Sequence, residues 1–586
     1  MPKHPPTPPN LPAPAADSPR RSPPGGEAGP PAWLPAVALV LLGFLTLAPV
    51  LRGGWLWDDN NEVTENRILR DPDGLARLWF SPTGPDYFPL KSTWQWLEWQ
   101  LWGPRPAGYH AASLGLHLLS ALLVWQLFRR LGLRWAWLGG LLFAVHPLAV
   151  ESVAWAAELK NTLSLPLLLL AMLGYLKYDD SGYASGARRR AYLGSLLCFL
   201  LAMLAKSSVV MLPAVLLLYA WWKRGRLAGR DLSAAAPFFA VSLALGLVTL
   251  RFQQHVAIGG WTIDAGSPLL RLVRAGAAIG FYLQKAFAPA GLSPLYPQWS
   301  FPPLSPIVIL HGLELIALLS LGWIYRASWG RHLLFGIGFF AINLLPVIGL
   351  VPISYMHYSW VADHFAYISI IGAAGLLAAG AGALARTAPG WSKPVIGAAA
   401  ILAALFALQS RLYAGTFHDS ETLWTRVLAD DPASWAAHYN LGFALAQAGR
   451  RPEGIAHYEA ALRLKPDLAE AQNSLGIALA QQGHLPEAIE HLREALRLNP
   501  DYAQAHVNLG TAWSLLGRVP EEIMEYRTAL RLNPDDAPAQ IHLGVTLLQA
   551  KRPAEAIPCF EAALRLDPGA GMVRQYLDYA RQQAAR

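Results

Sequence analysis

The sequence predicts an all-α protein in which a membrane-embedded helix bundle is followed by a solenoid of paired helices. Two observations predict this class. Hydrophobic residues make up 54% of the 586 residues and charged residues only 15%, with 23 tryptophans. That mixture is typical of a polytopic membrane protein with many interfacial aromatic residues. The last part of the chain instead repeats strictly every 34 residues, the period of tetratricopeptide repeats.

The net charge is divided unevenly between these two parts. The chain carries +8, but residues 435–586 hold 15 Lys and Arg against 17 Asp and Glu, so the remaining residues carry +10. This excess indicates membrane topology rather than a nucleic-acid surface. Cys198 and Cys559 lie in different parts of the chain, which excludes a disulfide framework. The sequence shows no zinc-type Cys/His spacing, phosphate loop or dinucleotide motif.

The N-terminal part begins with residues 1–32, which are dominated by Pro, Ala and Gly. Such a segment buries too little apolar surface to fold, so we expect a disordered cytoplasmic tail. The apolar run at residues 33–51 is long enough to cross a bilayer and starts too late for a cleaved signal peptide. The loop 52–108 that follows is predicted to be extracytoplasmic, with a Trp-rich helix in the interface plane.

Ten further apolar segments complete a predicted bundle of about eleven spans within residues 33–411. They are residues 109–128, 135–149, 162–178, 192–205, 209–222, 234–250, 306–325, 332–351, 365–384 and 394–409. Assigning the basic turns between them to the cytoplasm gives a consistent alternation and places the repeats outside. The segment 269–288 is ambiguous because it carries Arg271, Arg274 and Lys285. The count of eleven assumes that it lies along the membrane.

Four repeats are predicted in residues 435–570, after a connector at 412–434 and before a capping helix at 571–586. Three series of residues keep the 34-residue phase: Gly442, Gly476, Gly510 and Gly544; Pro466, Pro500, Pro534 and Pro568; Ala461, Ala495, Ala529 and Ala563. Stacked repeats of this kind form a concave surface that binds peptides. Asn440, Asn473 and Asn508 are candidate acceptor-binding residues on that surface, with inter-repeat packing as the alternative.

The first candidate for chemistry is the carboxylate pair Asp58 and Asp59 at the start of the first loop. Two carboxylates at the edge of a bilayer are costly unless they have a function. One of them could deprotonate an acceptor hydroxyl, while the second supports the geometry or helps to bind a metal ion. The alternative is a solvated turn that caps a helix.

Further ionisable residues fall on the same predicted membrane face. His146, Glu151 and Lys160 follow the third span, and ionisable groups so placed usually face a cavity or one another. The alternative is that His146 caps the helix and Glu151 pairs with Lys160. Lys206 lies between two apolar runs and could neutralise a lipid phosphate, although interface anchoring explains it equally well.

Asp363 and His364 lie between two later apolar runs, again on this face. A protonated His364 could assist Lys206 at a phosphate. It is the convergence of these residues on one face that favours a site.

The motifs resemble one known family, the transmembrane and tetratricopeptide-repeat O-mannosyltransferase-like proteins of the GT-C glycosyltransferase superfamily. The match runs from about residue 51 to the end of the chain. The matching motifs, in chain order, are Trp57-Asp58-Asp59, Phe88-Pro89-Leu90, Gly108-Tyr109-His110, His146-Pro147 with Glu151, Ala205-Lys206-Ser207, Leu292-Ser293-Pro294-Leu295-Tyr296-Pro297 and Val361-Ala362-Asp363-His364.

This resemblance implies a GT-C type membrane domain with an extracytoplasmic active site and a catalytic acidic motif at Asp58 and Asp59. It implies a polyprenyl-phosphate sugar donor, with mannose as the candidate sugar, and a protein Ser/Thr hydroxyl as acceptor. Lys160, Lys206, Asp363 and His364 are then the expected donor-phosphate residues, and His110, His146 and Glu151 the supporting ones. The Ala-, Arg- and Pro-rich composition favours a bacterial inner membrane.

Two other functions remain open at this point. The first is a non-catalytic tetratricopeptide scaffold for complex assembly, although an anchor needs only one span. The second is a lipid or small-molecule transporter, which the bulky Trp-rich outer loop and the one-sided arm suit less well.

Overall fold

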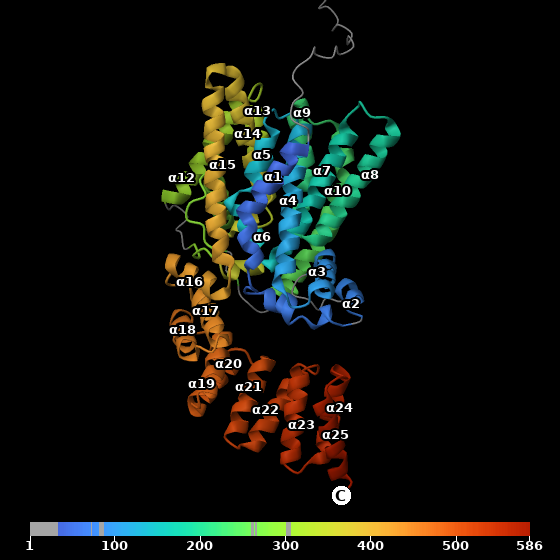
Figure 1. The fold of residues 1–586 in the computed structure, drawn as a ribbon, viewed down its shortest axis with the longest axis vertical. Coiled ribbons are helices and arrows are strands. Elements are labelled where there is room, and N and C mark those ends of the chain that lie inside the picture. The colour runs from blue at the N-terminus through green and yellow to red at the C-terminus, as the bar shows by residue number, and fades with distance from the viewer. Residues whose placement is uncertain (1–32, 72, 81–86, 259–262, 264–265, 300–305) are drawn as a thin grey trace, which may run out of the picture.

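The computed structural model describes residues 33–586 apart from residues 72, 81–86, 259–262, 264–265 and 300–305. Every regular element among these described residues is a helix, so the predicted all-α class is confirmed. The predicted disordered tail, residues 1–32, lies outside them. Figure 1 shows a bundle of long helices and a curved arm of shorter helices that leaves one end of it.

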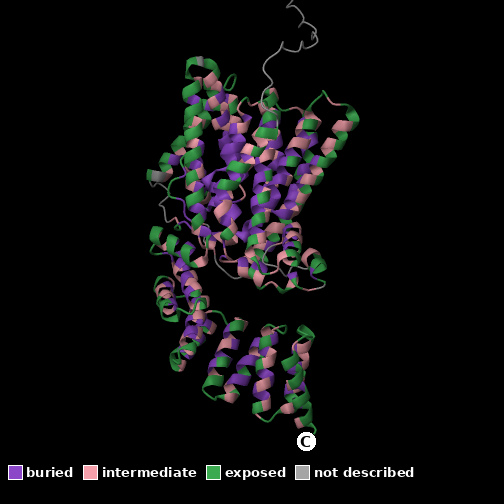
Figure 2. Ribbon diagram, in the orientation of Figure 1, coloured by how far each residue is buried: buried purple, intermediate pink, exposed green. Residues whose placement is uncertain are grey.

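The bundle is built by helices α1 to α15. They are α1 (Trp33–Leu47), α2 (Gly74–Phe80), α3 (Pro89–Trp102), α4 (Pro106–Arg130), α5 (Ala136–Ala144), α6 (Val150–Ala154), α7 (Leu159–Asp179), α8 (Ser185–Ala205), α9 (Leu212–Arg224), α10 (Gly229–Phe252), α11 (Pro268–Phe287), α12 (Pro306–Ile324), α13 (Gly330–Leu344), α14 (Ile370–Thr387) and α15 (Ser392–Ala414). Buried residues concentrate in the centre of this bundle, as Figure 2 shows.

The described helices do not support the predicted count of eleven spans. Six are long and apolar enough to cross a membrane, or seven if the bent pair α5 and α6 forms one span. Some of the predicted spans are short: α9 has 13 residues and α13 has 15. Helix α11, which carries two arginines and a lysine, is not part of that count. By length and composition the described helices therefore give fewer crossings than the eleven predicted.

Breaks in the helices bring polar residues to one end of the bundle. Pro147 follows His146, whose backbone is extended, and the chain bends by 52° there between α5 and the segment Pro147–Ala154. A residue before proline is disfavoured in the helical region, which explains the break. Lys206 is also extended, between α8 and the short helix η6 (Ser207–Met211). These breaks turn His146 and Lys206 out of regular helices.

The arm consists of helices α16 to α25. They are α16 (Ser420–Asp430), α17 (Trp435–Gln447), α18 (Arg451–Leu464), α19 (Ala469–Gln481), α20 (Leu485–Leu498), α21 (Ala503–Leu515), α22 (Val519–Leu532), α23 (Ala537–Gln549), α24 (Pro553–Leu566) and α25 (Gly571–Ala584). From α17 to α24 they form four consecutive helix pairs, whose bounds shift by 34 residues from pair to pair.

The repeated glycines lie where the two helices of each pair approach most closely. A Cβ atom on Gly510 would lie 2.8 Å from the Tyr526 ring, and one on Gly544 would lie 2.7 Å from the Phe560 ring. Gly442 and Gly476 meet Tyr458 and Leu492 in the same way. The Leu-Gly repeat in the sequence therefore follows from close helix packing, because a larger side chain would push the pair apart.

We expect Phe560→Ala to loosen the last repeat. The Phe560 ring is fully buried and stacks on Tyr576, with ring centroids 5.7 Å apart. Truncating a buried phenylalanine costs about 3–5 kcal/mol, and in a solenoid the loss stays near the altered repeat. Hydrogen exchange of the detergent-solubilised protein should therefore quicken in α24 and α25. Phe443→Ala, at a side chain that is 39% exposed, is the control; equal exchange in both variants would contradict the prediction.

Candidate functional site

A cavity of about 690 Å³ lies at the end of the bundle next to the arm. Its polar wall carries five of the ionisable residues that the helix breaks and the first loop bring together: Asp58, Glu158, Lys160, Lys206 and His364. Its apolar wall comes from η6, α10, the short helix η7 (Gln253–Ala257) that follows α10, and the loop after α13, and includes Val210, Leu250, Val256, Pro346, Val347 and Ile353. The cavity thus joins a charged end to an apolar end.

The two aspartates of the first loop are held very differently. Asp59 is fully buried, and its carboxylate accepts hydrogen bonds from the Leu56 N–H at 2.8 Å and the Ala157 N–H at 2.6 Å. Asp58 is half-buried and lines the cavity. Its Oδ1 atom is buried without a hydrogen-bond partner among the described residues. Asp59 therefore anchors the loop, whereas Asp58 has a carboxylate oxygen available for a ligand.

Burial is the main electrostatic influence on this pair. It raises the pKa of the Asp58 carboxyl well above its usual value, and the nearby Glu62 carboxylate raises it further. Burial also raises the pKa of Asp59 to about 8, although the two backbone N–H donors act against this shift. Neighbouring carboxylates disfavour each other's ionised forms. Glu62 is itself paired with Lys91, so one nearby charge is already balanced.

Trp57 directs Asp58 into the cavity. Its backbone φ of +41° lies in the left-handed region, which is costly for a bulky residue. Aromatic contacts hold it there: the ring stacks on Trp155 at 5.4 Å and meets Tyr358 and Trp424 edge-on at 5.1 and 5.0 Å. Trp155 and Tyr358 also line the cavity. An aromatic wall thus stands beside the Asp58 carboxylate.

The cationic side of the cavity is organised by Glu158. Its carboxylate lies 3.2 Å from Lys160 Nζ and 3.3 Å from Lys206 Nζ, and it accepts a 2.5 Å hydrogen bond from the Asn161 amide. Lys206 Nζ also donates to Asn161 Oδ1 at 2.7 Å. Both ammonium groups are therefore held in place at the cavity wall rather than extended into solvent.

His364 joins this cluster from the other side. Glu151 accepts the His364 backbone N–H at 2.8 Å, and its second oxygen lies 2.9 Å from the ring Nδ1 atom. The ring Nε2 atom lies 3.9 Å from Glu158. The sequence offered the pairing of Glu151 with Lys160 as an alternative to a site. That pairing is wrong, because Glu151 pairs with His364 and Lys160 pairs with Glu158.

Besides Asp59 and Glu151, described above, three predicted site residues of the membrane part do not line the cavity. Asp363 is fully buried, accepts hydrogen bonds from the Tyr296 and Tyr413 hydroxyls at 2.7 and 2.9 Å, and has its pKa raised to about 8 by burial. The predicted contact of Asp363 with a donor phosphate is therefore wrong, because both of its carboxylate oxygens accept hydrogen bonds behind the cavity wall. The other two, His146 and His110, approach backbone carbonyl oxygens.

These two histidines support the chain around the site. His146 accepts the Leu148 N–H at 3.2 Å and so caps the short helix η4 (Pro147–Ala149), with Nε2 3.0 Å from the Ala286 carbonyl. This is the capping arrangement weighed from the sequence. His110 Nε2 lies 3.4 Å from the Gly54 carbonyl, at the start of the first loop.

The arm asparagines contact each other or their own helix. Asn508 donates to Asn473 at 2.8 Å across two repeats, and Asn473 is only 4% exposed. Asn440 donates to the Ala436 carbonyl at 2.8 Å. The contact between Asn473 and Asn508 is one of inter-repeat packing, the alternative raised by the sequence, whereas that of Asn440 stays within α17.

The arm also contacts the cavity wall directly. The Trp435 ring, at the start of α17, stacks on Tyr358 at 5.7 Å, and Lys465 Nζ lies 3.0 Å from His357 Nε2. The Gly54 N–H donates to the His418 carbonyl at 2.8 Å. The first repeat is therefore fixed beside the Asp58 loop.

Sequence reasoning gave Glu158 no role in the site and missed the aromatic wall. Glu158 stands two residues before Lys160 in the sequence, and that proximity was the signal available. Among the residues that the structure describes, no group of three or more His, Cys, Asp and Glu side chains is arranged to hold a metal ion.

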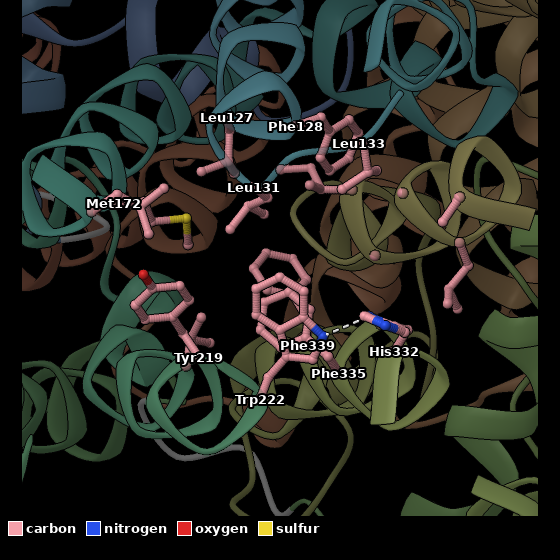
Figure 3. Close-up of a pocket in the computed structure, with 18 of the residues that line it drawn as sticks. Leu127, Phe128, Leu131, Leu133, Met172, Tyr219, Trp222, His332, Phe335 and Phe339 are labelled. Atoms are coloured by element: carbon pink, nitrogen blue, oxygen red, sulfur yellow. Dashed lines mark hydrogen bonds between the residues drawn. The ribbon is translucent and has the colours of Figure 1, made fainter. Parts of the chain in front are cut away.

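A second, smaller cavity of about 100 Å³ lies between α4, α7, α9, α13 and α14 (Figure 3). Its wall is almost wholly apolar, and the hydrogen bond drawn there joins the Trp222 indole N–H to His332 at 2.9 Å. It contains none of the predicted site residues.

Comparison with known proteins identifies relatives of both parts of the chain. Family models described as tetratricopeptide repeats match residues 434–501 and 525–571, which confirms the predicted repeats. The YrrB crystal structure, of a tetratricopeptide-repeat protein with an unusual peptide-binding site, is 20% identical with a TM-score of 0.26 and covers 28% of this chain and 86% of that one. At that TM-score the likeness says nothing about function.

Two curated relatives extend over the membrane helices as well. Mouse protein O-mannosyl-transferase TMTC4 is 28% identical over an alignment of 500 residues that covers 73% of this chain and 66% of that protein. Human protein O-mannosyl-transferase TMTC1 is 25% identical over an alignment of 426 residues that covers 64% of this chain and 47% of that protein. The chain thus spans just under two thirds of the first relative's length. The predicted resemblance is confirmed: over 73% of its length the chain is similar to the TMTC-like protein O-mannosyl-transferases, with membrane helices followed by tetratricopeptide repeats.

Proposed function

We propose that this protein is a membrane glycosyltransferase of the GT-C type that moves a sugar from a polyprenyl-phosphate donor to a Ser or Thr hydroxyl of a protein. The observation that carries the proposal is the cavity in which the Asp58 carboxylate, with a buried unpartnered oxygen, shares a wall with Lys160, Lys206 and His364. The similarity to protein O-mannosyl-transferases supports mannose as the sugar.

In the proposed reaction the acceptor hydroxyl oxygen attacks the anomeric carbon of the sugar. The bond from that carbon to the phosphate oxygen breaks, and polyprenyl phosphate leaves with the bonding electrons. Asp58 takes the hydroxyl proton as general base, and Lys160 and Lys206 stabilise the leaving phosphate. Asp59, Glu151, Glu158 and Asp363 position these groups.

The shape of the cavity suits such a donor. Its apolar wall on α10 and η6 can hold isoprene units, while exposed leucines of α10, such as Leu243 and Leu247, are suited to contact lipid. The aromatic rings of Trp155 and Tyr358 offer an apolar face for a sugar ring. The first repeat, fixed at Tyr358, is placed to present a protein acceptor.

For topology we propose that the cavity and the arm lie on the extracytoplasmic side of a bacterial inner membrane. The basic turn Arg188–Arg190 and residues Lys223 and Arg224 lie at the other end of their helices, where the positive-inside rule favours the cytoplasm. Shorter apolar helices such as α13 would then add to the six or seven spans.

We expect Asp58→Asn to lower sugar transfer at least 100-fold, because a general base contributes about 10²–10⁴-fold. Transfer of radiolabelled sugar to protein would be measured in membranes supplied with polyprenyl-phosphate mannose or, separately, polyprenyl-phosphate glucose. Asp71→Asn is the matched control, since Asp71 lies in the same loop but pairs with Arg77 at the surface. Normal transfer by Asp58→Asn would refute the assignment of the base. No transfer by the folded wild type with either donor would favour the scaffold.

Transfer should also rise with pH. A base must be ionised, and burial raises the pKa of Asp58 well above its usual value, so the active fraction grows as pH increases through that raised pKa. Wild-type kcat/KM, measured from pH 5 to 9, should therefore climb toward the alkaline side. Asp58→Glu should move the rise, whereas Asp71→Asn should leave it in place. A flat profile would contradict the role of a buried carboxylate base.

A further inference from the structure

A groove between α4, α7 and α8 collects cations at the end of the bundle opposite the candidate site. It encloses about 570 Å³. Arg130, Lys177 and Arg190 line one part of it, and Leu170, Leu173 and Cys198 line another. The proposed sugar transfer makes no use of these residues, and of them only Arg190 bears on the proposed topology.

The charge in this groove is of one sign. None of the described residues that line it is acidic. The nearest acidic side chain in sequence to Lys177 is Asp179, and its carboxylate lies 2.8 Å from Lys223 and 3.0 Å from Arg224, on α9. Two of the groove cations contact Tyr183 instead. The Tyr183 hydroxyl accepts a hydrogen bond from Arg130 at 2.9 Å, and Lys177 Nζ lies over the Tyr183 ring, 5.1 Å from its centroid.

The groove also has room between its helices. Gly174 lets α7 approach α8 closely, because a Cβ atom there would lie 3.0 Å from the Ala191 carbonyl. Gly194, on α8, has open space where its side chain would be. The glycines therefore join the two helices at one point and leave a hollow beside it.

The position of the groove relative to the membrane follows from the helices themselves. The candidate spans Pro106–Arg130 and Ala156–Asp179 both end beside it, so Arg130 and Lys177 lie at the level of a membrane surface. Leu170 lies about two turns before Lys177 on α7 and is 42% exposed, as a residue in contact with hydrocarbon would be. The groove therefore passes from a charged end at the surface to an apolar part within the bilayer.

We propose that this groove binds an anionic glycerophospholipid. Its phosphodiester, which carries one negative charge, lies among Arg130, Lys177 and Arg190, and an acyl chain lies along Leu170, Leu173 and Cys198. Basic pockets between membrane helices bind anionic headgroups because three cations and one phosphate attract each other in a region of lowered dielectric. A zwitterionic lipid offers the same phosphate but adds a cation that this all-basic groove disfavours.

The test is lipid retention by the purified full-length protein. Protein in detergent would be incubated with equal amounts of phosphatidylglycerol and phosphatidylcholine, and bound lipid counted by native mass spectrometry. The wild type should retain phosphatidylglycerol selectively. The variant Arg130→Gln/Lys177→Gln/Arg190→Gln should retain at least ten-fold less phosphatidylglycerol than the wild type. The control Arg129→Gln/Arg134→Gln/Arg189→Gln removes the same charge from the same end, at residues that do not line the groove.

Each outcome decides the question once a thermal melt shows that both variants are folded. Selective retention that only the groove variant loses supports the proposal. Equal losses in both variants would assign binding to overall charge and overturn it, as would unchanged retention in the groove variant. Displacement of the lipid by millimolar inorganic phosphate would make the occupant a free anion and overturn it as well. If the groove variant does not fold, Arg190→Glu alone must reverse the preference.

Discussion

The arrangement of the site depends on the carboxylate of Asp59. It is completely buried and accepts hydrogen bonds from Leu56 within its own loop and from Ala157, 98 residues further along the chain. These bonds fasten the first loop to the start of α7, where Glu158 and Lys160 follow immediately. A buried carboxylate is tolerated only when such donors satisfy it. Without this link, Asp58 and the lysines would have no common wall.

Breaks in the helices shape the same end of the bundle. Regular helices would leave His146 and Lys206 facing hydrocarbon or neighbouring turns, where unpaired polar groups are costly. In the structure the extended backbones at both residues are compensated: His146 caps η4, and Lys206 bonds to Glu158 and Asn161. The strained φ of Trp57 is compensated by aromatic packing. Each departure from regular structure at this end is therefore compensated by local hydrogen bonds or aromatic packing.

Some of this was readable from the sequence and some was not. The repeats could be read from the sequence, because close helix packing demands a small residue at a constant interval, as at Gly510. The acidic pair was also visible, but the bond that fixes Asp59 to the distant Ala157 N–H was not. The part that Glu158 plays was not visible, because its partners Lys206 and His364 come from distant segments. The predicted count of eleven spans exceeds the six or seven that length and composition give, because hydropathy registers apolar runs and not the breaks within them.

The balance of charge in the cavity bears on how the proposed transfer would be driven. A polyprenyl-phosphate sugar is a phosphodiester with one negative charge, whereas the polyprenyl phosphate that leaves is a monoester with up to two. The negative charge therefore grows toward the phosphate as the bond to the sugar breaks. Lys160 and Lys206 are already held by Glu158, so their orientation costs nothing further at that moment. Cations fixed in advance beside a growing charge favour the transition state over the bound donor. Glu158 moderates their attraction for the product phosphate, which must be released before the next donor binds.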